Sequence, residues 1–152
     1  MAGSPELVHQ AEALARAAHK DQVDKAGLPY IHHPARVATR VVGDDLAQAT
    51  AWLHDVVEDT EVTLTELAEA GFPEAVVAAV DALTRRPDEP ADDYYARVAA
   101  DPLALLVKRA DIADNCSPER LGLLDDATQT RLLAKYTHAR EVLASADASA
   151  QA

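Results

Sequence analysis

The chain has 152 residues, of which 49% are hydrophobic and 4% aromatic, and it carries a formal net charge of −12. This length suits one domain with a sizeable core, and the acidic charge argues against nucleic acid or an anionic membrane surface as a partner. No apolar run of about 18 residues and no signal-peptide pattern is present, so we expect no membrane span. Together with the single Cys116, this favours a cytoplasmic protein.

Ala and Leu dominate the composition, Gly is scarce, and no long β-branched run bounded by turns occurs. This pattern predicts an all-α fold, a single-domain helical bundle that spans residues 1–152. We expect an ordered core over about residues 4–144 and a frayed C-terminal tail from Ser145.

The first predicted helix begins at Ser4–Pro5, as N-cap and first helical position, and runs to about Lys20. His19, at its end, is expected at the surface or as a C-terminal cap. Residues 21–31 form a loop, and Lys25 within it is by itself most simply a solvated lysine.

The second predicted helix has Pro34 in its first turn and continues to about Val42. One or both of His32 and His33 therefore lie at a helix N-terminus, where the positive end of the helix dipole favours a neutral imidazole. Neutral imidazole is the form that binds a metal ion, although an ordinary capping histidine would have the same position.

The third predicted helix, capped by Asp44 or Asp45, runs to about Glu58. On one continuous helix, His54 and Glu58 would be one turn apart, and Asp55 and Asp59 would share their face. Such a face is either solvated or buried with a cation, because buried carboxylates need a positive partner.

Further helices are predicted after this segment, the first with Thr63 and Glu66 at the spacing of a capping box. Their expected positions are residues 63–71, 73–84, a helix containing Tyr94 and Tyr95, residues 102–115, a restart at Ser117–Pro118, and about 127–143.

Asp111 and Asn115 form a polar pair, one turn apart, on the otherwise apolar helix of residues 102–115. Four nitrogen or oxygen ligands are thus available from three helices. They are one of the two histidines at the start of the second helix, together with His54, Asp55 and Asp111. Two imidazoles and two carboxylates suit Mn²⁺, Fe²⁺ or Zn²⁺, and the lack of thiolates makes a structural zinc site less suitable.

Three motifs resemble those of the HD-domain metal-dependent phosphohydrolases of the RelA/SpoT type, which include small stand-alone hydrolases such as the metazoan SpoT homologue. The motifs are Pro-Tyr-Ile-His-His-Pro at 29–34, His-Asp-Val-Val-Glu-Asp at 54–59, and Val-Lys-Arg-Ala-Asp at 107–111 followed by Asn115. The resemblance covers roughly residues 11–143 and implies a helical bundle of the HD-domain type.

The resemblance implies a metal site and the residues that serve it. It implies His33, His54, Asp55 and Asp111 as ligands of a divalent ion, most often manganese. It implies that Glu58 and Asp59 orient or deprotonate the attacking water.

The resemblance also implies a small-molecule nucleotide substrate, contacted by Lys25, Asn115 and Tyr136. The reaction implied is removal of the 3′-pyrophosphate from the guanosine tetra- and pentaphosphate alarmones. No synthetase domain is present in these 152 residues, so alarmone synthesis is not expected. The sequence gives no indication of the oligomeric state.

Two alternatives remain open. Val23 and Asp24 stand beside Lys25 where basic residues would suit a highly charged substrate, unless Arg85 and Arg86 compensate. A different nucleotide, such as a 2′-phosphorylated dinucleotide or a nucleoside monophosphate, is therefore the second hypothesis. The third is a sensor that binds metal or nucleotide without turnover.

Overall fold

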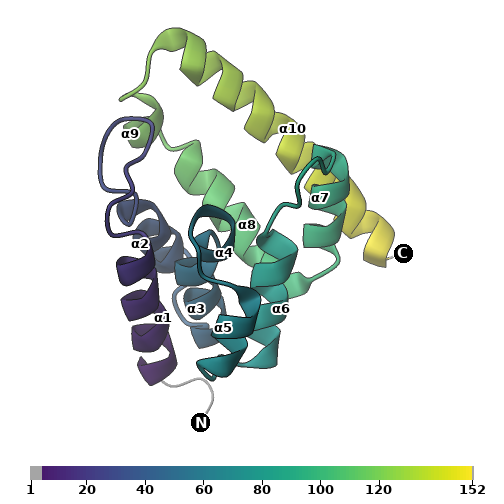
Figure 1. Ribbon diagram of the computed structural model, residues 1–152. Helices are drawn as coiled ribbons and strands as arrows, with labels where there is room; N and C mark the ends of the chain where they lie inside the picture. Colours follow the sequence, from purple (N-terminus) through teal and green to yellow (C-terminus); the bar gives the residue numbers. More distant parts are fainter. Residues whose placement is uncertain (1–4, 152) are drawn as a thin grey trace.

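The computed structural model describes residues 5–151 and confirms the all-α fold, with no strand among them (Figure 1). The helices are α1 (Pro5–Ala18), α2 (His32–Thr39), α3 (Asp45–Leu53), α4 (Val56–Asp59), α5 (Leu64–Glu69), α6 (Glu74–Leu83), α7 (Ala91–Ala99), α8 (Pro102–Asn115), α9 (Pro118–Leu121) and α10 (Asp126–Gln151).

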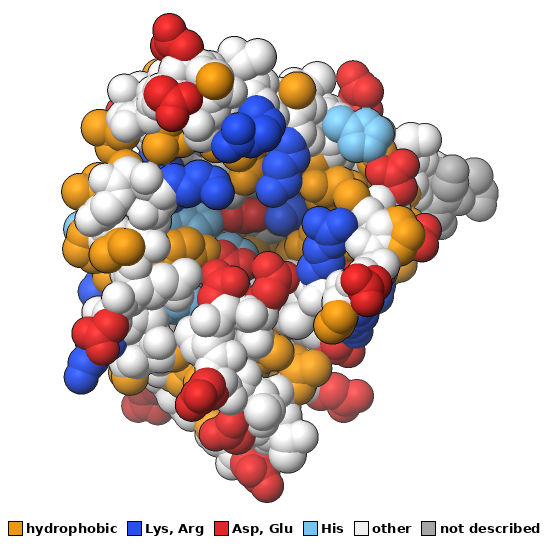
Figure 2. Space-filling model, turned by 45° about the horizontal axis from the view of Figure 1, so that its top comes forward, with side chains coloured by type: hydrophobic (Ala, Val, Ile, Leu, Met, Phe, Trp, Pro, Cys, Tyr) orange, Lys and Arg blue, Asp and Glu red, His pale blue; other side chains and the backbone are white. Residues whose placement is uncertain are grey.

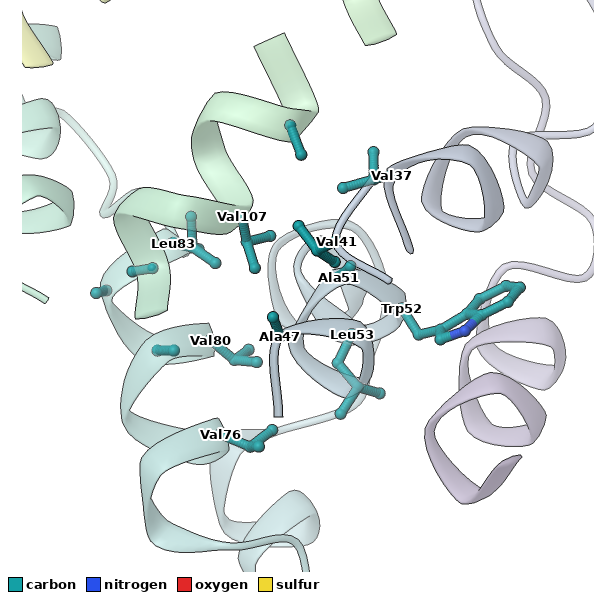
Figure 3. Close-up of a cluster of buried hydrophobic side chains, with 14 of the residues drawn as sticks. Val37, Val41, Ala47, Ala51, Trp52, Leu53, Val76, Val80, Leu83 and Val107 are labelled. Carbon is teal, nitrogen blue, oxygen red and sulfur yellow. The ribbon is translucent and has the colours of Figure 1, made fainter. Parts of the chain in front are cut away.

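Helix α3 is the centre of the bundle, in contact with α1, α2, α6 and α8. Its sequence is rich in alanine, and Ala47 and Ala51 are completely buried, which lets neighbouring helices approach closely. Leu53 on α3 and Val80 on α6 contribute to the same cluster, together with Val107 on α8 (Figure 3). The helix that precedes the polar residues 54–59 is thus packed on several sides.

Helix α10 lies across the bundle from α9 to α7, and it packs mainly on α7 and also contacts α8 (Figure 1). The predicted end of this helix near Leu143 is wrong, because the helix continues to Gln151. Leu143 is buried and Ala146 packs against the core, so apolar contacts extend into the segment expected to fray.

Several predicted helix starts are confirmed by their side-chain caps. Asp44 accepts a hydrogen bond from the backbone of Ala47 at the start of α3. Thr63 and Glu66 form the predicted capping box of α5, and Ser117 caps α9. The predicted cap at Ser4 lies outside the described residues.

His19 follows the last residue of α1, but the expectation that it could lie at the surface is wrong, because only 1% of its surface is exposed. Its ring packs 4.9 Å from the ring of Tyr30, and its Nδ1 lies 2.8 Å from Oε1 of Gln22. The loop of residues 21–31 folds back over the end of α1 and covers the side chain, which a local pattern at the helix end does not reveal.

Among residues 5–151, none of the helices is both long enough and apolar enough to cross a membrane.

Candidate metal centre and cavity

The sequence predicted one continuous helix through the polar motif at residues 54–59. This prediction is wrong, because α3 ends at Leu53 and α4 begins at Val56. Between them, Asp55 has φ −108° and ψ 1°, outside the helical region. His54 Nδ1 donates to the carbonyl of Ala51 at 2.6 Å, a side-chain bond near the helix end. The break directs His54 into the core, and Glu58 and Asp59 remain on the exposed side.

Three of the four predicted metal ligands converge in the interior. His33 from α2, His54 from the end of α3, and Asp111 from α8 each offer one ligand atom, and these atoms lie within 4.8 Å of one another. All three side chains are buried. The fourth, Asp55, is beside them, with its Oδ2 3.1 Å from Nε2 of His54.

His54 is the residue that best indicates a cation at this site. Because its Nδ1 donates to a carbonyl, its Nε2 carries the lone pair whenever the ring is neutral, as it must be to bind a metal ion. This buried Nε2 has no hydrogen-bond partner among the described residues, yet it lies 3.4 Å from a carboxylate oxygen of Asp111 as well as beside Asp55. A lone pair and two carboxylates that converge on one point fit a divalent metal ion.

His33 is oriented toward the same point by Asp114, a residue that the sequence did not single out. Its Nδ1 lies 2.6 Å from Oδ2 of Asp114, and its Nε2 lies 2.7 Å from Oδ1 of Asp111. Asp114 is almost fully buried and also accepts from Nε of Arg36 at 2.8 Å. A carboxylate on one ring nitrogen fixes the tautomer so that the other nitrogen can bind metal. Its position one turn after the apolar Ala110 indicated that Asp114 faces the inner side of α8, but it did not indicate the pairing with His33.

Arg120 on α9 completes this group. Its guanidinium donates to Asn115 Oδ1 at 2.5 Å and lies 3.3 Å from Asp114 Oδ2 and 3.5 Å from Asp24 Oδ2. Asp24 in turn accepts hydrogen bonds from two backbone N–H groups of its own loop. Arg120 therefore connects the loop of residues 21–31 to helix α8.

The electrostatics of the cluster favour a cation. Burial alone lowers the pKa of His54, but the carboxylates of Asp55 and Asp111 outweigh it and hold this pKa well above its usual value. Desolvation opposes ionisation of Asp111, yet Lys108 and the two imidazoles hold its pKa well below the usual range. The same carboxylates favour the protonated form of His54 when no metal is bound, so metal binding would release a proton.

Two further side chains fix the carboxylates. The hydroxyl of Tyr30 donates to Asp55, and burial, followed by the charge of Asp55, raises the pKa of Tyr30 far above its usual value. Nζ of Lys108 donates to Asp111 Oδ2 at 2.9 Å. Asn115 also donates to Asp111, through Nδ2 to Oδ1 at 3.1 Å, so hydrogen bonds fix the orientation of both carboxylates.

A cavity of about 410 Å³ opens next to the cluster. Figure 2 shows this hollow with Lys and Arg side chains along its upper margin, Asp and Glu along its lower margin, and His and acidic side chains inside. The predicted site residues that line it are Lys25, His33, Asp55, Glu58, Asp59, Asp111, Asn115 and Tyr136. His54 lies behind this lining.

Glu58 and Asp59 stand at the mouth of the cavity rather than in the cluster. Partial burial raises the pKa of Glu58, although the backbone N–H of Arg85 at 2.8 Å opposes this. Burial and the charge of Asp55 raise the pKa of Asp59, whose Oδ2 lies 3.4 Å from Nε2 of Gln22. Carboxylates with raised pKa values are suited to accept a proton.

The structure also resolves the residues that the sequence left ambiguous. His32 is exposed, and only His33 points inward. Arg85 donates to the carbonyl of Glu89 in its own loop, and Arg86 pairs with Asp81 of α6 at 2.6 Å. Neither arginine lines the cavity.

Comparison with known proteins identifies the family. Residues 11–101 match the family described as "HD domain". This match spans more than half of the chain, and the chain therefore belongs to the HD-domain family.

The curated relatives are long proteins with a similar region. The guanosine-3′,5′-bis(diphosphate) 3′-pyrophosphohydrolase of Aquifex aeolicus is 34% identical over 121 residues, which are 72% of this chain and 17% of that protein. The pyrophosphohydrolase of the same name from Vibrio cholerae is 34% identical over 126 residues, again 72% of this chain and 17% of the relative. A GTP pyrophosphokinase of Streptomyces coelicolor is 34% identical over 120 residues, 71% of this chain and 14% of that protein.

The chain therefore spans about one sixth of the length of these relatives. A solved structure described as "A metazoan ortholog of SpoT hydrolyzes ppGpp and plays a role in starvation responses" has the same fold, with a TM-score of 0.76 and 21% identity over 97% of this chain and 93% of that one.

Proposed function

We propose that this chain is a single HD hydrolase domain that removes the 3′-pyrophosphate of guanosine tetra- or pentaphosphate, with a divalent metal ion as cofactor. The observation that carries the proposal is the unpartnered Nε2 of His54, directed at the carboxylates of Asp55 and Asp111 beside a cavity lined by both basic and acidic side chains. Relatives named as 3′-pyrophosphohydrolases support the substrate.

His33, His54, Asp55 and Asp111 would hold the ion. Two imidazoles and two carboxylates suit Mn²⁺, Fe²⁺ or Zn²⁺, and the resemblance to the family favours Mn²⁺ among them. A bound divalent ion supplies charge neutralisation for the phosphates and favours ionisation of water. The protein's own part is to fix the ligands, through Asp114 on His33, Lys108 on Asp111 and Tyr30 on Asp55.

Either Glu58 or Asp59 would take the proton from the attacking water, because both carboxylates face the cavity and have raised pKa values. The water's oxygen forms the new bond to phosphorus as the bond between that phosphorus and the 3′ oxygen breaks. Pyrophosphate is released, and the 3′ oxygen takes up a proton to become a hydroxyl. Lys25, Asn115 and Tyr136 line the cavity and are proposed to contact the nucleotide. A nucleotide substrate also supports the cytoplasm as its compartment.

A second candidate keeps the metal and changes the nucleotide. Asp24 lies 3.5 Å from Arg120 and neutralises one of the cavity's cations, so fewer positive charges remain for a substrate with many phosphates. A 2′-phosphorylated dinucleotide or a nucleoside monophosphate carries fewer charges.

The test is to incubate metal-stripped protein with guanosine tetraphosphate, with and without Mn²⁺, and to separate the products. We expect GDP and pyrophosphate only when Mn²⁺ is added. The Asp55→Ala variant should give neither product, and Asp93→Ala, which removes an exposed carboxylate of α7, should match the unaltered protein. Bound metal without cleavage would contradict the proposed substrate, and a panel of the other nucleotides would then identify the one that is cleaved.

A further inference from the structure

Glu58 is held at the cavity by the loop of residues 84–90, which joins α6 to α7 (Figure 1). The backbone N–H of Arg85 donates to Oε1 of Glu58 at 2.8 Å, a contact between residues that are 27 positions apart in the chain. This bond occupies Oε1 and limits rotation of the carboxylate. Oε2 therefore remains for a water molecule in the cavity that Glu58 lines.

The peptide bond between Thr84 and Arg85 carries this N–H, and its opposite end contacts α7. Nη2 of Arg97 donates to the carbonyl oxygen of Thr84 at 2.8 Å. The carbonyl and the N–H belong to one trans peptide unit, in which they point in opposite directions. One rigid planar group therefore connects the guanidinium of Arg97 to the carboxylate of Glu58.

The charges at the two ends of this peptide match its dipole. The cation of Arg97 faces the negative carbonyl end, and the anion of Glu58 faces the positive amide end. Consecutive hydrogen bonds polarise one another, so the bond from Arg97 strengthens the N–H as a donor to Glu58. Loss of the Arg97 guanidinium would therefore loosen Glu58 from a distance.

Arg97 is itself fixed by two further contacts. It pairs with the side chain of Glu89, and Oε1 of Glu89 accepts the backbone N–H of Arg86 at 3.0 Å. Its guanidinium carbon lies 5.6 Å from the centre of the Tyr94 ring. Arg86 also donates to the carbonyl of Thr84, but its side chain is 42% exposed, against 29% for Arg97. Water screens the more exposed charge more strongly, so Arg97 has the larger influence on this peptide.

We propose that Arg97 is a positioning residue for Glu58 and acts through the peptide bond between Thr84 and Arg85. This inference rests on the proposed function, because it requires Glu58 to take part in turnover. Arg97 lies outside the three sequence motifs and does not line the cavity. Its effect should therefore fall on kcat rather than on KM or on metal binding.

The first experiment measures steady-state kinetics with guanosine tetraphosphate and Mn²⁺. Arg97→Met keeps the length of the side chain but removes its donors, and we expect kcat to fall about tenfold. KM and the Kd for Mn²⁺ should not change. Arg97→Lys, which retains the charge and a donor, should recover part of the loss. The control is Arg16→Met, because Arg16 also pairs with a glutamate and lies 5.2 Å from an aromatic ring, that of Trp52, yet is outside the cavity.

A double-mutant cycle tests whether the effect passes through Glu58. In the Glu58→Gln background, Arg97→Met should change kcat little further, because the group that Arg97 positions is already gone. A general loss of stability would lower turnover by the same factor in both backgrounds, and that result would overturn the proposal. An Arg97→Met variant with unchanged kcat, or with a raised KM alone, would overturn it as well.

The second experiment separates this inference from the proposed activity. Hydrogen exchange of the Arg85 amide is followed by NMR in the metal-free protein, without substrate. Exchange should become about tenfold faster in Arg97→Met and in Glu58→Ala, and it should not change in Arg16→Met. If no nucleotide is cleaved but both variants expose the Arg85 amide, the link from Arg97 to Glu58 stands and the proposed activity fails. If Arg97→Met leaves this exchange rate unchanged, the link is wrong even when the nucleotide is cleaved.

Discussion

His54 illustrates how much of the site follows from the sequence at the scale of single residues. Its role as a ligand was predicted from its motif, and the structure buries it beside His33 and Asp111. Its hydrogen bond to the carbonyl of Ala51 was not predictable, because the sequence indicated a continuous helix there. Asp114 was missed for a related reason, since its partner His33 is 81 residues away in the chain.

Glu58 provides the first prediction. The Glu58→Gln variant should bind Mn²⁺ with nearly unchanged affinity, because Glu58 is outside the group of ligand atoms. Its turnover should fall about a hundredfold or more, because a neutral amide does not accept a proton. Metal titration and steady-state kinetics test this, with Glu61→Gln, an exposed residue outside the cavity, as the control. Near-native turnover of the Glu58 variant would show that its assigned role is wrong.

Asp114 provides the second prediction. Asp114→Asn keeps an acceptor for His33 but removes the negative charge that orients the ring and makes it a stronger ligand. We expect the Kd for Mn²⁺ to rise about 10- to 100-fold, measured by titration of metal-stripped protein. Asp93→Asn, which changes an exposed carboxylate, serves as the control. An unchanged Kd would mean that Asp114 has no influence on the ligand.

The same carboxylate predicts a response of the metal-free protein to acid. Burial opposes ionisation of Asp114, but His33 and Arg36 outweigh it and lower its pKa from 3.8 to about 2. Its stabilisation, about 2 kcal/mol, is therefore present above about pH 4 and is lost as the pH falls toward about 2. Urea unfolding should show a difference between Asp114→Asn and the unaltered protein that is larger at about pH 5 than at about pH 2.5. A difference that stayed constant with pH would contradict the lowered pKa.

At the scale of elements, the prediction from sequence succeeded where helix signals are local. The capping box of α5 and the Ser117 cap of α9 need only three or four consecutive residues, and both are present. The prediction missed the break between α3 and α4, because residues 51–60 contain no Gly or Pro that would indicate a helix end. The predicted end of α10 was also wrong, because the helix is extended by its packing on α7 rather than by its own composition.

The capping box gives a prediction for a single element. Thr63→Ala removes the acceptor for the backbone N–H of Glu66 and should lower the free energy of unfolding by about 1 kcal/mol. For a chain of this size, that corresponds to a fall in Tm of about 3 °C. Thr137→Ala, at an exposed position within α10, should change Tm less, and both variants should keep full activity. Equal Tm values for the two variants would show that the Thr63 cap does not contribute to the stability of α5.

At the scale of the whole molecule, the metal cluster joins segments that are far apart in the chain. His33, His54 and Asp111 belong to α2, the end of α3 and α8. These helices pack through an apolar core, and at their meeting point the buried imidazoles and carboxylates pair with one another and, at Asp111, with Lys108. A bound ion would therefore act on the folding equilibrium as well as on catalysis.

Metal removal should accordingly destabilise the chain. At a free Mn²⁺ concentration about 100 times the Kd, we expect the free energy of unfolding to be about 2.7 kcal/mol higher than in the chelated protein. Thermal unfolding with and without Mn²⁺ measures this difference, and Asp55→Ala should show little of it. A Tm that did not respond to Mn²⁺ would argue against metal binding by the folded state.

The cavity is assembled from two parts of the chain that need not change together. The family match ends at residue 101, whereas Arg120, Lys135 and Tyr136 line the cavity from α9 and α10. Substitutions on these last helices should therefore retune which nucleotide is accepted while His33, His54 and Asp55 stay untouched. For the redesign of specificity, a focused library over residues 120–136 is the natural choice, with the rest of the bundle left as a fixed scaffold.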